Sequence, residues 1–148
     1  MPITYGHNIT PEEINELRKS LGWRRIHPQQ LLDNLAGSSL VVTAICDDRV
    51  IGMSRLLWTG GVMAVIPDLL IKPEFQNQGI EEELITRILD FLRTKLKPGY
   101  GIQVDLRVWQ HQDKFEALGF IEATQRLRGT PLHICLTDQI ELTDAILG

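Results

Sequence analysis

The first part of the chain carries two short helical patterns. A cap residue, Thr10, is followed by a proline and, three positions after the cap, by Glu13, a combination that predicts the start of a helix. Apolar residues then recur at helical spacing until Gly22, which predicts the end of that helix. Residues 28–35 predict a second helix that ends near Gly37. We therefore expect two helices before the first strand.

Strand patterns follow these helices. Residues 40–46 are rich in β-branched side chains, and residues 49–58 return after the turn Asp47-Asp48, so a β-hairpin is expected. Residues 62–71 predict a third strand, but Pro67 lies inside it. Because proline cannot donate a hydrogen bond to a strand ladder, we expect a bulge or a splay before the last residues of this strand.

The second half of the chain opens with an amphipathic helix after residue 79. Its apolar face consists of Leu84, Ile85, Ile88, Leu89 and Leu92. Residues 102–109 then alternate as a strand, and residues 113–118 predict one or two helical turns closed by Gly119. A last hairpin is expected from residues 120–127 and 131–136.

The order of these elements predicts an α/β (α+β) fold in a single domain over residues 1–148, with a mixed, mainly antiparallel sheet flanked by helices. A length of 148 residues with 43% hydrophobic residues suffices for one sizeable core. The net charge of −4 and the lack of a dense Lys/Arg run disfavour binding to nucleic acid or to an anionic membrane. The first residues lack the basic and apolar segments of a targeting sequence, so we expect a cytoplasmic protein.

The cysteines and histidines indicate no metal chemistry. Cys46 and Cys135 lie far apart in apolar, strand-like runs, which favours buried and reduced thiols over the alternative of a disulfide. The four histidines are scattered along the chain, and neither cysteine has a histidine at a ligand or nucleophile spacing, so no metal site is expected.

Residues 68–81 form the most informative segment, because a buried strand, a tight polar loop and a helix start follow one another directly. Such a loop exposes successive backbone N–H groups, and the N-terminus of the helix adds partial positive charge. This junction therefore predicts an anion cradle, that is, a loop whose backbone N–H groups bind an anion, and phosphate is the expected ligand.

The sequence Gln76-Asn-Gln-Gly-Ile-Glu81 resembles the Gln/Arg-x-x-Gly-x-Gly/Ala loop of the GCN5-related N-acetyltransferase (GNAT) family, which holds the pyrophosphate of acetyl-CoA. Further resemblance lies in Asp68-Leu-Leu-Ile-Lys-Pro, in Val50-Ile-Gly52 with Arg55 upstream, and in Phe115-Glu-Ala-Leu-Gly-Phe120, which is similar to the family's Tyr-Glu-Lys-Leu-Gly-Phe. These motifs cover roughly positions 40 to 121 in the family's order, a combination far more specific than a single glycine-rich hexapeptide.

The resemblance implies acetyl-CoA as the cofactor and assigns residues to it. The expected phosphate contacts are Gln76, Asn77, Gln78, Gly79, Ile80, Glu81 and Glu82. In the family the splayed strand pairs its free backbone groups with the pantetheine arm, a role that falls here on Leu69, Leu70 and Ile71. The alternative for these three residues is an ordinary bulge without a ligand.

Two residues depart from the family's pattern. Glu81 places a carboxylate where the family has a small residue and phosphate approaches the backbone, although acidic side chains in a first helical turn suit the helix dipole and can point outward. Phe115 stands where the family usually has a tyrosine that protonates the departing thiolate. Phenylalanine can pack against the cofactor, and a thiolate, with a thiol pKa of about 8.5, leaves tolerably without a general acid.

The acceptor side gives weaker signals. Asp68 is the carboxylate nearest the splay and the expected general base, with a structural role in capping a turn as the alternative. His111 and Asp113 are further candidates for proton relay. The resemblance places Trp23 and Arg24, with the neighbouring Arg25, over the acceptor pocket; the alternative is a half-buried tryptophan under two solvated arginines.

Arg55 could hold an anionic group of the substrate or an internal carboxylate, and Trp109 could add an aromatic wall.

Three functions remain open at this point. The first is an N-acetyltransferase that transfers the acetyl group of acetyl-CoA directly to a primary amine of a small molecule or a protein. The second, motivated by Glu81 and Phe115, is a catalytically weakened acyl-CoA-binding or regulatory module with the same fold. The third is an interaction domain that binds no CoA, which would require the loop match to be a coincidence. Ile134 and Leu136 offer an apolar edge at which two copies could form a homodimer.

Overall fold

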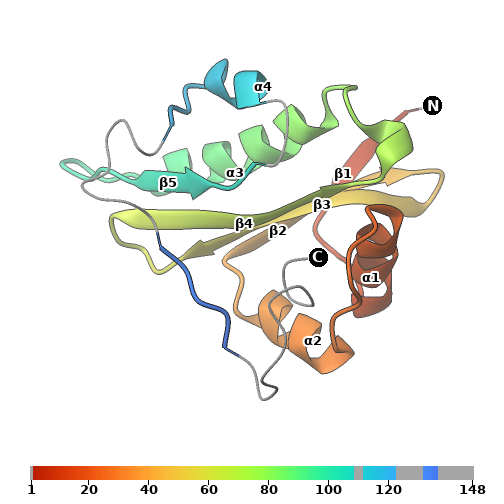
Figure 1. Cartoon of the computed structure of the whole chain (residues 1–148). Coiled ribbons are helices and arrows are strands. Elements are labelled where there is room, and N and C mark those ends of the chain that lie inside the picture. The colour runs from red at the N-terminus through yellow and green to blue at the C-terminus, as the bar shows by residue number, and fades with distance from the viewer. Residues whose placement is uncertain (1, 109–111, 123–131, 137–148) are drawn as a thin grey trace.

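The computed structural model describes residues 2–108, 112–122 and 132–136, in which a five-stranded sheet carries helices on both faces (Figure 1). The elements in chain order are β1 (Thr4–Gly6), α1 (Pro11–Ser20), α2 (Pro28–Ala36), β2 (Leu40–Cys46), β3 (Arg49–Trp58), β4 (Met63–Ile71), a 3₁₀ turn (Pro73–Phe75), α3 (Ile80–Lys95), β5 (Gln103–Leu106) and α4 (Gln112–Glu116).

The strands lie in the order β1-β2-β3-β4-β5. Neighbours from β1 to β4 are antiparallel, whereas β4 and β5 are parallel, which requires the long crossover that α3 provides. The predicted α/β class with a mixed, mainly antiparallel sheet is therefore confirmed.

The start of the sheet differs from the expectation. We expected two helices before the first strand, but β1 precedes both and pairs with β2, with Tyr5 opposite Ala44. A strand of three residues is too short to show a period of two along the sequence, and its position is fixed by the edge of β2 that it covers.

The start of α1 and the turn between β2 and β3 follow from residues that are close together in the sequence. The Thr10 hydroxyl accepts a hydrogen bond from the Glu13 N–H at 3.2 Å, while the Glu13 carboxylate accepts one from the Thr10 N–H at 2.9 Å, so the predicted capping box is formed. The hairpin of β2 and β3 turns at Asp47 and Asp48, both with positive φ, as a two-residue turn of type I′ requires.

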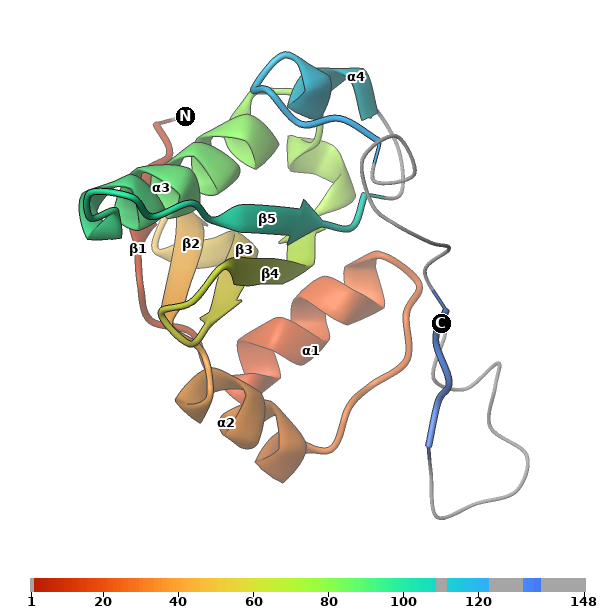
Figure 2. The same ribbon diagram turned by 90° about the vertical axis from the view of Figure 1, so that its left-hand side faces the viewer.

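Helix α3 covers one face of the sheet, and α1 and α2 cover the other (Figure 2). Apolar side chains form a cluster on each face. The larger cluster lies under α3, and it includes Ile66 and Ile71 of β4. The smaller cluster joins α1 and α2 to the sheet, and its buried members are Ile14, Leu17, Leu31, Met53 and Leu70. Residues of β4 thus serve both faces, as the alternation of a strand dictates.

Pro67 marks an irregularity in β4. Arg55 pairs with Asp68 and Leu57 with Val65, so two steps along β3 correspond to three along β4, which therefore carries one extra residue. In addition, β5 pairs with β4 only from Met63 to Ile66. Beyond Pro67, β4 keeps β3 on one side and has lost β5 on the other, which confirms the predicted bulge and splay.

The later elements are shorter than predicted. The strand expected over residues 102–109 is β5, Gln103–Leu106, and Trp109 lies outside the described residues. Part of the expected last hairpin also falls outside them, and its described parts, residues 120–122 and 132–136, adopt neither helix nor strand, contrary to the expectation. In that second segment Leu132, Ile134 and Leu136 are exposed.

Both cysteines are free thiols, Cys46 buried as expected and Cys135 only partly covered, contrary to the expectation of burial. Within the described ranges, no helix combines the length and the apolar character that crossing a bilayer requires.

Candidate functional site

The predicted anion cradle begins where β4 ends. After the 3₁₀ turn the chain passes through Asn77 and Gly79, whose φ angles are 63° and 85°, before α3 starts. Gly79 is the N-cap of α3 and offers no side chain to satisfy the first N–H groups of the helix. A Cβ built on Gly79 would meet nothing within 4 Å, so the backbone here faces open space. This geometry suits an anion.

Two glutamines brace the loop from within. Gln76 donates a hydrogen bond from Nε2 to the Ile71 carbonyl at 3.0 Å, and Gln78 donates one to the Glu74 carbonyl at 3.1 Å. Gln76 therefore ties the loop to the end of β4.

The splayed end of β4 directs backbone groups toward the side that β5 has left. The Lys72 N–H donates to the Ile51 carbonyl at 2.9 Å. In the alternation of an antiparallel ladder, the N–H and C=O groups of Leu70 then face β3, whereas those of Leu69 and Ile71 face away from it. Two of the three residues expected to meet the pantetheine arm thus have the required backbone orientation, although the Ile71 carbonyl already accepts from Gln76. Leu70 buries its side chain toward α1 and α2.

Glu81 does not point outward. It is only 8% exposed, and its Oε1 accepts a hydrogen bond from the Asn77 N–H at 3.1 Å. Lys114 of α4 contacts both Glu81 and Asn77. Its Nζ lies 3.8 Å from Glu81 Oε1 and donates a hydrogen bond to Asn77 Oδ1 at 2.7 Å. The sequence analysis missed Lys114, because a glutamate and a lysine so far apart along the chain show no periodic relation.

The remaining loop residues are divided between core and surface. Ile80, the first residue of α3, is buried, and Glu82 is half-buried with an Oε1 that has no hydrogen-bond partner among the described residues. Glu83, the next residue, forms an exposed pair with Arg87 at 3.0 Å.

A pocket lies on the opposite face of the sheet, between α1, α2 and strands β3 and β4. Its lining consists of Ile14, Arg18, Ile26, Leu31, Asn34, Leu35, Met53, Arg55, Asp68 and Leu70. Of the predicted substrate residues, Arg55 lines this pocket, whereas Trp23 and Arg24 are not among its lining residues. The lining combines apolar walls with a few convergent polar groups around a cavity of only about 30 Å³.

Arg55 and Asp68 form an ion pair in this pocket, with the Arg55 Nε donating to Asp68 Oδ2. The guanidinium also donates to the Ser38 hydroxyl at 3.3 Å and to the Asn34 carbonyl at 3.4 Å. The Ser54 hydroxyl donates to the Asp68 carbonyl at 2.5 Å. Arg55 therefore holds an internal carboxylate, and Asp68 stands in β4 opposite Arg55.

Arg18 is a pocket residue that the sequence analysis missed. It sits one helical turn after Ile14 on the apolar side of α1, the signal that could have indicated a half-buried basic residue. Burial lowers the pKa of the Arg18 guanidinium from its ordinary value, and the Asp68 carboxylate opposes this shift. The guanidinium lies 5.5 Å from the ring centroid of Trp23 and donates to the Arg24 carbonyl at 2.6 Å. Trp23 is half-buried and Arg24 exposed.

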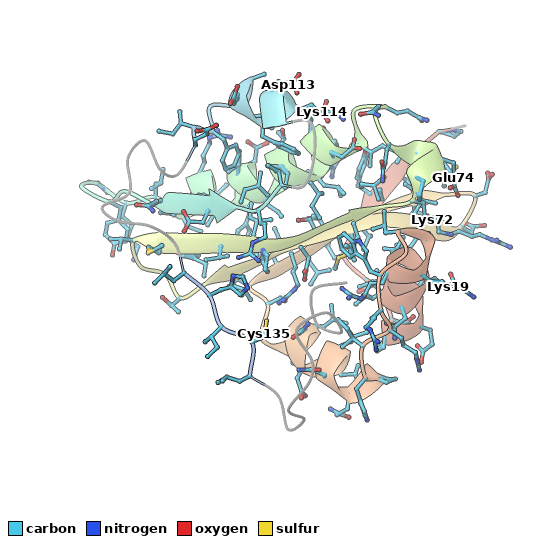
Figure 3. All side chains as sticks on the ribbon, in the orientation of Figure 1. Lys19, Lys72, Glu74, Asp113, Lys114 and Cys135 are labelled. Atoms are coloured by element: carbon cyan, nitrogen blue, oxygen red, sulfur yellow. The ribbon has the colours of Figure 1, made fainter. Side chains whose placement is uncertain are left out.

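Phe115 lies on the other side of the sheet. It is 4% exposed and belongs to the apolar cluster under α3. Asp113 and Lys114, its neighbours on α4, lie on the same side of the sheet as α3 (Figure 3). Asp113 is exposed, and His111 falls outside the described residues.

Among the described residues, no group of three or more His, Cys, Asp or Glu side chains comes together as a set of metal ligands. His7 bonds to the Val41 carbonyl through Nδ1, and His27 caps α2 by accepting from the Gln29 N–H.

Comparison with known proteins supplies an independent observation. The model of the acetyltransferase (GNAT) family matches residues 9–120. The chain is 28% identical over 90 residues to the uncharacterized N-acetyltransferase ycf52 of Pyropia yezoensis, a match that covers 58% of this chain and 52% of that relative. The chain thus spans about half the length of the curated relatives it matches.

Solved structures share the fold. A protein of unknown function from meticillin-resistant Staphylococcus aureus superposes with a TM-score of 0.76 at 21% identity, covering 90% of this chain and 100% of that one. The PaiA N-acetyltransferase of Thermoplasma acidophilum, in complex with coenzyme A, gives a TM-score of 0.54 at 20% identity, over 64% of this chain and 74% of that one. At these identities the likeness concerns the fold alone.

Proposed function

The chain belongs to the acetyltransferase (GNAT) family, and we propose that it is an N-acetyltransferase that moves the acetyl group of acetyl-CoA directly to a primary amine of a small molecule or a protein. The observation that carries this proposal is the continuity of two features. A strand end with outward-facing backbone groups leads, within a few residues, into a loop with left-handed Asn77 and Gly79 at the start of α3.

These residues suit a CoA cofactor. The open backbone at Gly79 and the first turn of α3, from Ile80 to Glu82, would receive the pyrophosphate, with Asn77 and Gln78 in the loop and Gln76 holding it to β4. Leu69 and Ile71 would pair their backbone with the pantetheine arm. When bound, acetyl-CoA supplies an activated acetyl thioester.

The acceptor amine needs a base. An alkylamine has a pKa of about 10 and is mostly protonated at neutral pH, so it must lose a proton before it can attack a carbonyl. Asp68 lines the pocket, and the ion pair with Arg55 fixes the orientation of its carboxylate. We assign Asp68 as this base. Phe115 supplies an apolar wall and no proton, so the thiolate leaves without a general acid.

The pocket also carries positive charge. Arg18 stands in an apolar lining together with Arg55 and Asp68, and it stacks on Trp23. This charge favours an amine substrate that also bears an anionic group, with Trp23, Arg24 and Arg55 as proposed substrate contacts.

Calorimetric titration with acetyl-CoA, followed by an amine screen for thiol release, tests the proposal. We expect micromolar binding and turnover of at least one amine. Asp68→Asn should lower kcat by about 10²- to 10⁴-fold with the dissociation constant of CoA unchanged. Asp90→Asn, an exposed change on α3, is the matched control and should leave kcat unchanged. Failure of acetyl-CoA to bind would refute the proposal.

A second candidate keeps the cofactor and loses efficient chemistry. It is favoured by Glu81, whose carboxylate already occupies the Asn77 N–H, and by a phenylalanine in place of the usual acid. Tight binding of acetyl-CoA without turnover of any amine would identify this acyl-CoA-binding module.

A further inference from the structure

Glu81 and Lys114 form a covered ion pair at the entrance of the loop, although they come from different helices. The Lys114 side chain is 17% exposed, and its ammonium group bridges Asn77 Oδ1 at 2.7 Å and Glu81 Oε1 at 3.8 Å. Figure 3 shows Lys114 on α4, on the same side of the sheet as α3. α4 is thereby linked to the loop through two charges.

The Glu81 carboxylate is only half satisfied. Its Oε1 accepts from the Asn77 N–H and faces Lys114, but its Oε2 is buried and finds no hydrogen-bond partner among the described residues. A buried carboxylate oxygen without a donor is costly, and such a group in a native structure calls for a physical explanation. An anion therefore already sits at this loop, and it is poorly bound there.

The donor that Glu81 uses belongs to the cradle itself. Asn77 adopts a positive φ two residues before the open backbone of Gly79, so its N–H is one of the nearby donors that an anion would meet. Glu81 Oε1 thus occupies a place that suits a phosphate oxygen.

We propose that Glu81 is an internal substitute for a cofactor phosphate and that Lys114 is a phosphate ligand held ready by it. This inference rests on the cofactor site proposed above. An incoming phosphate takes the Asn77 N–H, the Glu81 side chain turns out toward solvent, and the Lys114 ammonium exchanges the carboxylate for the phosphate.

The chemistry of the two side chains fits this exchange. The four-carbon stem of lysine lets the ammonium follow a new anion without a shift of α4. The CoA pyrophosphate as a whole carries more negative charge than one carboxylate and offers more acceptor oxygens, so it competes well for both the N–H and the ammonium. In the absence of the cofactor, the Glu81 carboxylate therefore occupies the position proposed for a phosphate oxygen.

Calorimetric titration of the whole chain with CoA tests the exchange in four forms: wild type, Glu81→Gln, Lys114→Met and the double variant. Glutamine keeps the oxygen that accepts from Asn77 but removes the charge, and methionine keeps most of the apolar stem of lysine. We expect Glu81→Gln to tighten CoA binding by about tenfold and Lys114→Met to weaken it by about tenfold.

The double variant separates two roles of Lys114. If Lys114 binds phosphate, Lys114→Met weakens CoA binding in the Glu81→Gln background as well, by about tenfold or more. If Lys114 only neutralises Glu81, the same change leaves the dissociation constant in that background unaltered, and the inference is overturned.

Matched controls come from the same helix. Glu83→Gln removes the same charge from the same first turn of α3, but at an exposed pair with Arg87, and should change the dissociation constant less than about twofold. Equal effects of Glu81→Gln and Glu83→Gln on the dissociation constant of CoA would overturn the inference. A lower Tm of Glu81→Gln and Lys114→Met with unchanged CoA binding would also overturn it, because the pair would then only stabilise the packing of α4 on α3. Absence of CoA binding in wild type and Glu81→Gln alike would instead refute the cofactor site itself, and the inference with it.

Discussion

Arg55 and Asp68 face each other across β3 and β4 as register partners, and their side chains form an ion pair on the face of the sheet that α1 and α2 cover. The extra residue in β4 at Pro67 sets this relationship, because it shifts every later residue of the strand by one place. The extra residue therefore coincides with the separation of β4 from β5 beyond Ile66, and it also directs the Asp68 side chain toward the pocket.

Removing Arg55 should destabilise the fold as well as the pocket. Arg55→Met leaves Asp68 without its cation and Ser38 without a donor. We expect the free energy of unfolding to fall by about 1–3 kcal/mol. This is less than for a fully buried ion pair, because the Asp68 side chain is 33% exposed and solvent screens its charge. Urea denaturation measures this loss.

Arg93→Met is the control for that change. It breaks the pair with Asp90, in which both side chains are more than half exposed, and should cost no more than about 0.5 kcal/mol. Equal losses in the two variants would show that the Arg55–Asp68 pair contributes no more than a surface pair.

Gly79→Ala isolates the left-handed backbone of the cradle. The φ of 85° strains any residue with a Cβ, yet the added methyl meets nothing within 4 Å, so we expect a loss of about 1–2 kcal/mol from the backbone alone. Gly101→Ala also adds a methyl in open space, but without positive φ, and should be neutral or slightly stabilising. If chemical denaturation gives both variants the same stability, the loop does not hold Gly79 in this conformation.

The elements that sequence reasoning placed best are those whose signals are local. The predicted bounds 40–46 and 49–58 coincide with β2 and β3, because two β-branched runs flank turn residues that accept positive φ. Pro67 likewise carried enough information to predict the bulge, since its missing N–H is incompatible with a regular ladder.

Long-range contacts account for what the sequence did not reveal. The Glu81–Lys114 pair exists only because α4 is placed over the start of α3, and no spacing along the chain indicates it. The pairing of Asp68 with Arg55 depends on a register that a single extra residue decides. The cradle could thus be recognised from its residue types, but the charges around it required the structure.

The stability of the protein should change at alkaline pH through Tyr5. Burial raises the pKa of the Tyr5 phenol above 10.0, and the nearby Glu83 carboxylate adds to the shift while Arg87 opposes it. An acid whose pKa is raised on folding contributes stability that is complete below pH 10.0 and is lost as pH rises through the raised pKa. Curves of stability against pH for wild type and Tyr5→Phe should therefore run parallel below pH 10.0, and wild type should lose stability more steeply between pH 10.0 and the raised pKa. Curves that stay parallel throughout would contradict the shift.

Phe115→Tyr tests the departure from the family's usual acid. Because Phe115 is 4% exposed within the cluster under α3, the added hydroxyl is buried, and without a partner it should lower the free energy of unfolding by about 1–3 kcal/mol. Phe91→Tyr is the control: Phe91 is half-buried on α3, so its new hydroxyl should reach water at little cost. In the acetyl-transfer assay we expect kcat of Phe115→Tyr to change less than about tenfold, since a thiolate leaves without help. A larger gain in kcat would mean that this ring borders the reacting thioester and that the missing proton donor limits an otherwise complete enzyme.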